Sequence, residues 1–194
     1  MNTVLTLSPK SEPYNKDEIL RYLGAKTMDK ATEELIDSCI AEADSVIHGI
    51  ICYKEFNIKK NDGGLDLGFC KTQSKLLLSH LCGCESVILF AATIGISIDR
   101  LIMKYAKTSP SRAVVLSAIG SERVESLCNA FEKTVETECA EKVSRVSCGY
   151  GDIPLSMQKD IISVLDTPRK IGITLGDNLL MTPKKSVTAI IGIR

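Results

Sequence analysis

The chain has 194 residues, and its 24 lysines and arginines balance its 24 aspartates and glutamates, which suits a single domain with a substantial core. No basic cluster is longer than a pair and tryptophan is absent, which argues against nucleic acid or an acidic membrane surface as a partner. No apolar run approaches the roughly 20 residues that span a bilayer, and residues 1–13 lack the order of a signal peptide, so we expect a cytoplasmic protein.

Capping signals and the helical spacing of apolar residues predict six helices. They cover, in chain order, about residues 15–23, 29–47, 72–81, 97–106, 112–142 and 155–165. The first begins at a capping box, with Asn15 as the N-cap and Glu18 reaching back to it, and stops at Gly24. The fifth is the longest, and we interpret most of its glutamates as a solvated face.

Runs of β-formers between these helices predict the strands. They cover about residues 50–58, 65–69, 86–92, 143–147, 170–175 and 186–193. Residues 86–92 are continuously apolar, which indicates a buried central strand. Because strands and helices do not alternate regularly, we predict the α+β class, with an antiparallel-rich sheet and several helices including one long helix. Residues 1–14 are interpreted as an N-terminal arm or edge segment, and 15–194 as one domain.

The eight cysteines are scattered, and this pattern favours free, buried thiols in a reducing compartment over a disulfide framework. Cys82 and Cys84 are close in sequence, with Cys70 and His80 nearby, so a thiol or soft-metal site is a weaker hypothesis. The spacing lacks the second pair of a zinc motif, and we prefer a tight turn and predict no metal. His48 and His80 are interpreted as structural, and no catalytic triad is recognisable.

Residues 143–158 carry the densest set of ligand-binding features. Arg145 offers a planar fork of donors for a carboxylate or phosphate. Glycines on both sides of Tyr150 allow positive φ angles and a close approach of the backbone. Asp152 precedes Pro154 and a helical pattern, so it is a candidate N-cap. These features predict a site for a small, partly anionic molecule; the alternative is a tight strand-to-helix turn with a solvated arginine.

The sequence of this stretch also resembles a known signature. It reads Arg145-Val146-Ser147-Cys148-Gly149-Tyr150-Gly151-Asp152, followed by Pro154-Leu155 and Gln158. It resembles the activation domain of cobalamin-dependent methionine synthase, in which an Arg-x-(Ser/Ala)-Pro-Gly-Tyr run binds S-adenosylmethionine. Single-domain relatives continue with Gly-Asp-x-Pro-Leu-x-x-Gln. Weaker similarity at residues 17–24, 81–95 and 181–187 extends the resemblance over nearly the whole chain.

The resemblance implies a set of ligand-binding residues. The matching positions are Arg145, Ser147, Gly149, Tyr150, Glu125, Asn129 and Asp152. Arg145 would pair with the methionine carboxylate, the backbones of Ser147 and Gly149 would hydrogen-bond the ligand, and Tyr150 would line the pocket. Cys148 replaces the proline of the signature. Asn129 stands where the long enzyme has an acidic contact, and Glu125 lies one turn earlier as a substitute.

The resemblance also implies a role in methionine biosynthesis. In that family S-adenosylmethionine remethylates cobalamin that has been oxidised to cob(II)alamin, while a flavodoxin-like protein supplies an electron. Such a domain works by positioning a methyl group and needs no general base. We therefore expect a free-standing reactivation subunit that acts, as a methyltransferase component, on a separate cobalamin-bearing methionine synthase. The alternative is a non-catalytic module that docks on another corrinoid methyltransferase protein.

Overall fold

The computed structural model describes residues 3–61, 63–139 and 141–194. Its helices are α1 (Lys16–Leu23), α2 (Lys30–Asp44), α3 (Lys75–His80), α4 (Ser97–Tyr105), α5 (Pro110–Glu138), the 3-10 helix η1 (Leu155–Met157), α6 (Gln158–Leu165) and α7 (Thr167–Lys170). Its strands are β1 (Leu5–Leu7), β2 (Ile50–Asn57), β3 (Lys59–Asn61), β4 (Gly64–Asp66), β5 (Lys71–Thr72), β6 (Ser86–Thr93), β7 (Thr174–Leu175), β8 (Met181–Thr182) and β9 (Ser186–Ile193).

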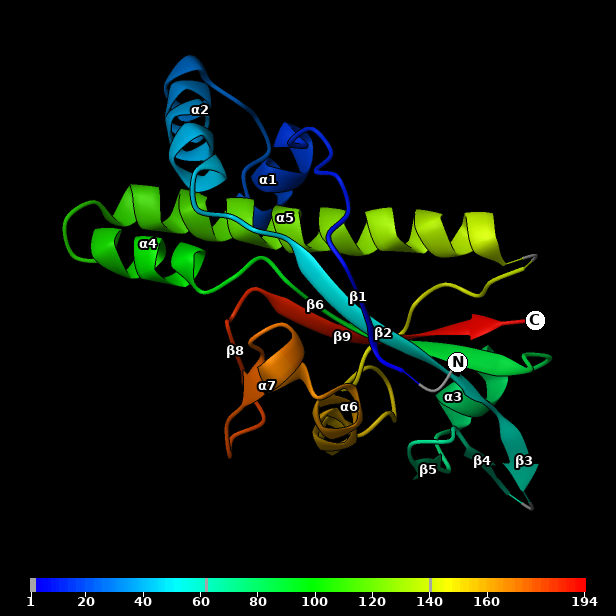
Figure 1. The fold of residues 1–194 in the computed structure, drawn as a ribbon. Coiled ribbons are helices and arrows are strands. Elements are labelled where there is room, and N and C mark those ends of the chain that lie inside the picture. The colour runs from blue at the N-terminus through cyan, green and yellow to red at the C-terminus, as the bar shows by residue number, and fades with distance from the viewer. Residues whose placement is uncertain (1–2, 62, 140) are drawn as a thin grey trace.

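A four-stranded antiparallel sheet forms the centre of the fold, in the order β1-β2-β6-β9 (Figure 1). β6 is buried along its whole length, which confirms the buried central strand. Two small sheets, β3-β4-β5 and β7-β8, lie outside this sheet. Together with the long helix α5, this arrangement confirms the predicted α+β class.

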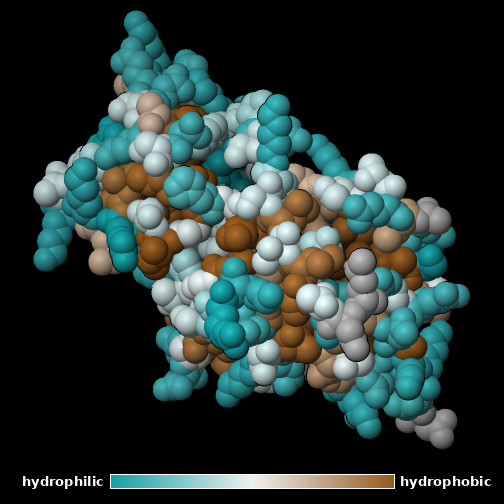
Figure 2. All heavy atoms as spheres, in the orientation of Figure 1, coloured by the Kyte–Doolittle hydropathy of each residue, from teal (hydrophilic) through white to brown (hydrophobic). Residues whose placement is uncertain are grey.

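The sheet separates two hydrophobic cores, because successive side chains of a strand point to opposite faces. On one face, Ile88 and Phe90 of β6 pack with Phe131 of α5, and residues of α1, α2 and α4 complete this core. On the other face, Leu89 packs with Leu77 of α3 and with α6. Each buried side chain of this size contributes about 1.5–3 kcal/mol. Figure 2 shows hydrophilic side chains over most of the outline of this view and hydrophobic ones nearer its middle.

The segment that precedes α1 is anchored on the domain. β1 pairs with β2 as an edge strand. Further along, Arg123 of α5 donates to the carbonyl oxygens of Glu12 (2.7 Å) and Pro13 (3.1 Å), and its guanidinium stacks on the ring of Tyr14 at 3.9 Å. These contacts fix the direction in which the chain enters α1.

The first helix is capped partly as predicted. The Asn15 side chain accepts from the Glu18 amide (3.1 Å), and Gly24 ends the helix with φ of 69°. The predicted return contact from Glu18 is wrong, since its carboxylate binds Arg21 instead. The Asn15 amide donates to Glu122 of α5 (3.2 Å), so a tertiary contact replaces the local one.

Two predicted strands are also wrong. Residues 143–147 form no strand, and the connection to β9 consists of isolated bridges at Lys142 and Val146. Residues 170–175 contain the end of α7 and the two-residue β7. Pro168 suits the first turn of a helix, and Gly172, with φ of 72°, interrupts an extended chain. No helix in the described ranges has the length and hydrophobicity of a membrane span.

Candidate ligand-binding site

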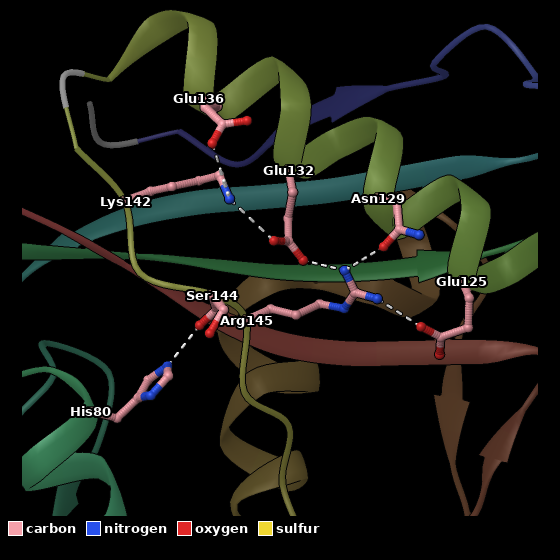
Figure 3. Close-up of polar contacts among 8 residues, drawn as sticks. All are labelled: His80, Glu125, Asn129, Glu132, Glu136, Lys142, Ser144 and Arg145. Carbon is pink, nitrogen blue, oxygen red and sulfur yellow. Dashed lines mark hydrogen bonds and ion pairs between the residues drawn. The ribbon is translucent and has the colours of Figure 1, made fainter.

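Arg145 extends from the irregular segment after α5 back toward that helix (Figure 3). Its Nη2 donates to Glu125 Oε2 (2.7 Å), and its Nη1 donates to Asn129 Oδ1 (2.8 Å) and to the carboxylate of Glu132. The three acceptors are spaced four and three residues apart, so they lie on one face of α5. The helix thus presents a row of acceptors to a single guanidinium.

A second cation extends this network. Lys142 contacts the carboxylates of Glu132 (3.3 Å) and Glu136 (3.8 Å). Burial by itself would lower the pKa of Arg145, but its contacts with the glutamates outweigh burial and raise the pKa above its ordinary value. The cluster joins the carboxylates of Glu125, Glu132 and Glu136 to the basic side chains of Arg145 and Lys142. The side chain of Glu132 is only 14 % exposed, so the predicted solvated face is wrong at this position.

An open pocket of about 530 Å³ lies beside the Arg145 guanidinium. It is lined by Leu76, His80, Glu125, Ser144, Arg145, Val146, Ser147, Tyr150 and Val187. Tyr150 stands at its rim and is 67 % exposed. Arg145, Ser147, Tyr150 and Glu125, which the sequence predicts as ligand contacts, thus line the same pocket. Asn129 joins them through its hydrogen bond to Arg145.

The loop beyond Arg145 is closed by its own backbone hydrogen bonds. The Gly149 amide donates to the Ile153 carbonyl (3.0 Å), and the Tyr150 amide donates to the Ser147 carbonyl (3.3 Å). Gly149 and Gly151 have φ angles of 84° and 58°, which confirms that both glycines take the left-handed region. The Gly149 amide is used within the turn, and the predicted backbone contact of Gly149 with a ligand stays a prediction.

Asp152 does not cap the helix that follows it, and this prediction is wrong. Its carboxylate accepts from the Ser74 hydroxyl and from the amides of Lys75 (2.7 Å) and Leu76 (3.2 Å), at the start of α3. Pro154 has the extended backbone that precedes η1, and no side chain caps that helix. Asp152 lies outside the Arg145 pocket and lines a neighbouring hollow.

Three residues of the site were missed or assigned another role. Glu132 follows Glu125 by seven residues and Asn129 by three, and this helical spacing was a usable signal. Lys142 also belongs to the cluster. His80 Nε2 lies 2.7 Å from the Ser144 carbonyl oxygen, although 64 residues separate the two. No local sequence signal indicates that contact.

The thiols show no site of their own. All eight cysteines are free; Cys82 is exposed and Cys84 is buried. Burial raises the pKa of Cys70 to about 12 and that of Cys148 to about 11, so both thiols are protonated at neutral pH. Within the part of the chain that the structure describes, no three potential metal ligands come together.

Comparison with known proteins supports the fold. No protein-family model and no curated protein matches the chain. Among solved structures, it is similar to one described as "Crystal Structure of the MetH Reactivation Domain bound to AdoHcy", with a TM-score of 0.73 and 12% sequence identity over 98% of this chain and 78% of that one. The chain has the MetH reactivation-domain fold. The resemblance implied by the Arg145–Asp152 signature is thus confirmed at the level of architecture.

Proposed function

We propose that the chain binds S-adenosylmethionine in the Arg145 pocket and takes part in the reductive methylation of cobalamin carried by another protein. The observation that carries this proposal is Arg145 held by Glu125, Asn129 and Glu132 at the wall of an open pocket. The solved structure to which the chain is similar is described as bound to AdoHcy. The expected partners are a cobalamin-dependent methionine synthase or another corrinoid protein, and a flavodoxin-like electron donor.

The donor set suits the amino-acid end of such a ligand, which carries a carboxylate and an α-ammonium group. Glu125 is 37 % exposed and holds Arg145 from the pocket side, whereas Glu132 is more buried and is also held by Lys142. An exposed ion pair contributes only about 0–1 kcal/mol. A ligand carboxylate can therefore replace Glu125 at Arg145, which leaves the Glu125 carboxylate free to accept from the ligand ammonium.

The charge of the site favours a cationic ligand. Glu125, Glu132 and Glu136 outnumber Arg145 and Lys142 by one formal charge. At neutral pH S-adenosylmethionine carries a net positive charge, whereas its demethylated product is neutral overall. The excess carboxylate therefore favours the sulfonium form over the thioether.

S-adenosylmethionine supplies an electrophilic methyl group on a sulfonium, which is already a good leaving group. The residues of this chain then need only bind, orient and shield the ligand. Arg145 orients the amino-acid end through a charge-assisted hydrogen bond from Nη2, the group that Glu125 occupies in the free chain. Tyr150, at the exposed rim of the pocket, offers its ring as a cover and its hydroxyl as a polar contact.

Titration calorimetry with S-adenosylmethionine tests the proposal directly. The wild-type chain should bind, and Arg145→Ala should weaken binding by at least about tenfold, because a charge-assisted hydrogen bond contributes about 1.5–3 kcal/mol. Arg169→Ala is a matched control, since Arg169 is highly exposed and contacts only Asp166 among the described acidic residues. Unchanged affinity in Arg145→Ala would refute the proposed site. Electron-dependent methylation of an added cob(II)alamin protein then tests the reaction.

One observation favours a second function. Arg145 already has three protein acceptors, so its place for a ligand carboxylate is filled in the free chain. A module that docks on a corrinoid protein without binding S-adenosylmethionine would keep this closed network. Tight binding to a corrinoid protein, together with no calorimetric signal from S-adenosylmethionine, would select this alternative.

A further inference from the structure

We infer that α3 acts as a clamp on the ligand loop, with Asp152 and His80 as positioning residues that hold Arg145–Gly151 in the shape its ligand needs. The inference rests on the proposed function for the identity of the ligand. The clamp itself is a property of the free chain and can be tested without any ligand.

The loop needs such support because it has little regular structure of its own. Between α5 and η1, the described backbone is tied to the main sheet only by bridges at Lys142 and Val146. A segment with few ladder hydrogen bonds opens locally at low cost. The residues of this segment that line the pocket therefore depend on contacts from outside the sheet; they are Ser144, Arg145, Val146, Ser147 and Tyr150.

The end of the loop is fixed by Asp152 at the start of α3. The first amides of a helix have no partner within the helix. Asp152 accepts from the amides of Lys75 (2.7 Å) and Leu76 (3.2 Å), and also from the hydroxyl of Ser74. Ser74 accepts in turn from the Leu77 amide (3.1 Å). The Asp152 carboxylate, which lies at least 76 residues from these partners in the sequence, thus completes the N-terminal cap of α3. The same contacts hold the end of the loop against α3.

The beginning of the loop is fixed by the last residue of the same helix. His80 Nε2 lies 2.7 Å from the carbonyl oxygen of Ser144, the residue directly before Arg145 (Figure 3). A carbonyl oxygen only accepts, so Nε2 carries the proton in this contact. The contact fixes the peptide group from which the Arg145 side chain departs.

The last residue of the loop, Gly151, lies directly against α3. A Cβ atom on Gly151 would come within 2.6 Å of Leu76 Cδ1, and Gly151 has a φ angle of 58°. Any other residue would be strained at this φ angle and would displace the Leu76 side chain, so glycine suits this close approach. The six-residue helix thus contacts the loop at both of its ends, whereas the Arg145 side chain is held separately by its acceptors on α5.

The function of the clamp is pre-organisation. A loop that is already in its bound shape loses less conformational entropy when the ligand binds, and affinity rises accordingly. We expect loss of the capping contact to weaken binding by about tenfold, which corresponds to about 1.4 kcal/mol. Breaking the clamp should therefore weaken binding while Arg145 and its acceptors remain in place.

The test compares Asp152→Asn and His80→Ala with the wild type by two measurements. The first is hydrogen exchange of the amides of residues 145–151 in the free protein, with the amides of β6 as an internal reference. The second is calorimetric affinity for S-adenosylmethionine. We expect faster exchange confined to the loop and about tenfold weaker binding in both variants. His80→Asn keeps a side-chain N–H donor, so it should restore part of the exchange protection and part of the affinity. Asp160→Asn is the control, because it removes another exposed carboxylate near the loop, and it should resemble the wild type.

The outcomes separate the two proposals. If the wild type does not bind S-adenosylmethionine, the proposed function fails, and exchange at residues 145–151 still decides whether the clamp exists. If Asp152→Asn and Asp160→Asn exchange alike at the loop, the clamp is refuted, whatever their affinities. Faster exchange throughout β6 as well would also overturn it, because Asp152 would then stabilise the whole domain and not the loop.

Discussion

Two arginines contact glutamates of α5, and they differ in what encloses them. Arg123 pairs with Glu122, and the two side chains are 6 % and 3 % exposed. Two further N–H groups of Arg123 donate to the carbonyl oxygens of Glu12 and Pro13, and the Tyr14 ring covers its guanidinium. Arg145 also pairs with glutamates of α5, but one side of it faces an open pocket.

This difference separates a structural ion pair from an exchangeable one. A pair whose side chains are almost fully buried is costly to break, because removal of one partner leaves an uncompensated buried charge. A pair beside an open pocket can exchange one partner for a ligand group at little cost. The surroundings, and not the residue types, thus assign Arg123 to the fold and leave Arg145 accessible to the proposed ligand.

The largest effect should follow from Arg123→Ala. We expect the free energy of unfolding to fall by about 3–5 kcal/mol, because Glu122 is left buried without its partner. Urea denaturation measures this loss. Lys133→Ala is the control, since Lys133 contacts Glu12 from an exposed position. A loss below about 1 kcal/mol would show that solvent reaches this cluster.

Arg145→Ala should cost much less stability than Arg123→Ala. We expect a loss of about 1 kcal/mol in the same urea titration, because Glu125 is partly exposed and Glu132 keeps Lys142 as its partner. Ligand binding should nevertheless be lost. Equal destabilisation by the two substitutions would mean that both arginines stabilise the fold to the same extent. That result would contradict the distinction between a structural and an exchangeable ion pair.

Alkaline pH should weaken the enclosed cluster in particular. Burial, followed by the hydrogen bond to Asp44 (3.1 Å), raises the pKa of Tyr14 well above its ordinary value, which is about 10. The neutral hydroxyl therefore contributes stability that is complete below about pH 10 and is lost as the pH rises toward the folded pKa. Urea titrations from pH 8 to pH 11 should show a smaller decline for Tyr14→Phe than for the wild type. Tyr150→Phe, at the open site, serves as the matched control, and identical declines for wild type and Tyr14→Phe would contradict the assignment.

The smallest effect should appear in thiol labelling. Cys128 is buried in α5 close to Arg145, and burial raises its pKa to about 12. Alkylation followed by peptide mass spectrometry should label the exposed Cys82 first and Cys128 only when the protein opens. Arg123→Ala should accelerate labelling of Cys128, whereas Arg145→Ala should change it little. Rapid labelling of Cys128 in the wild type would show that the Arg145 site opens into the core.

Much of the fold and half of the site follow from local sequence patterns. The apolar run at β6 predicts a strand covered on both faces, and Asn15 and Gly24 mark the ends of α1. Arg145 belongs to a recognisable signature, and Glu125 lies one helical turn before Asn129 on α5. Both residues line the same pocket. Each of these signals depends on backbone periodicity or on residues a few positions apart, which a sequence displays directly.

Only the tertiary structure decided which glutamates of α5 are buried, which helix Asp152 caps, and that His80 holds the Ser144 carbonyl. These features join residues that lie far apart in the chain and meet because helices pack on the two faces of the sheet. A side chain's partners depend on which surfaces that packing brings together and from which it excludes water. Sequence spacing alone does not encode which surfaces meet. A glutamate at a given helical position can therefore be solvated or buried, and only its tertiary surroundings decide which.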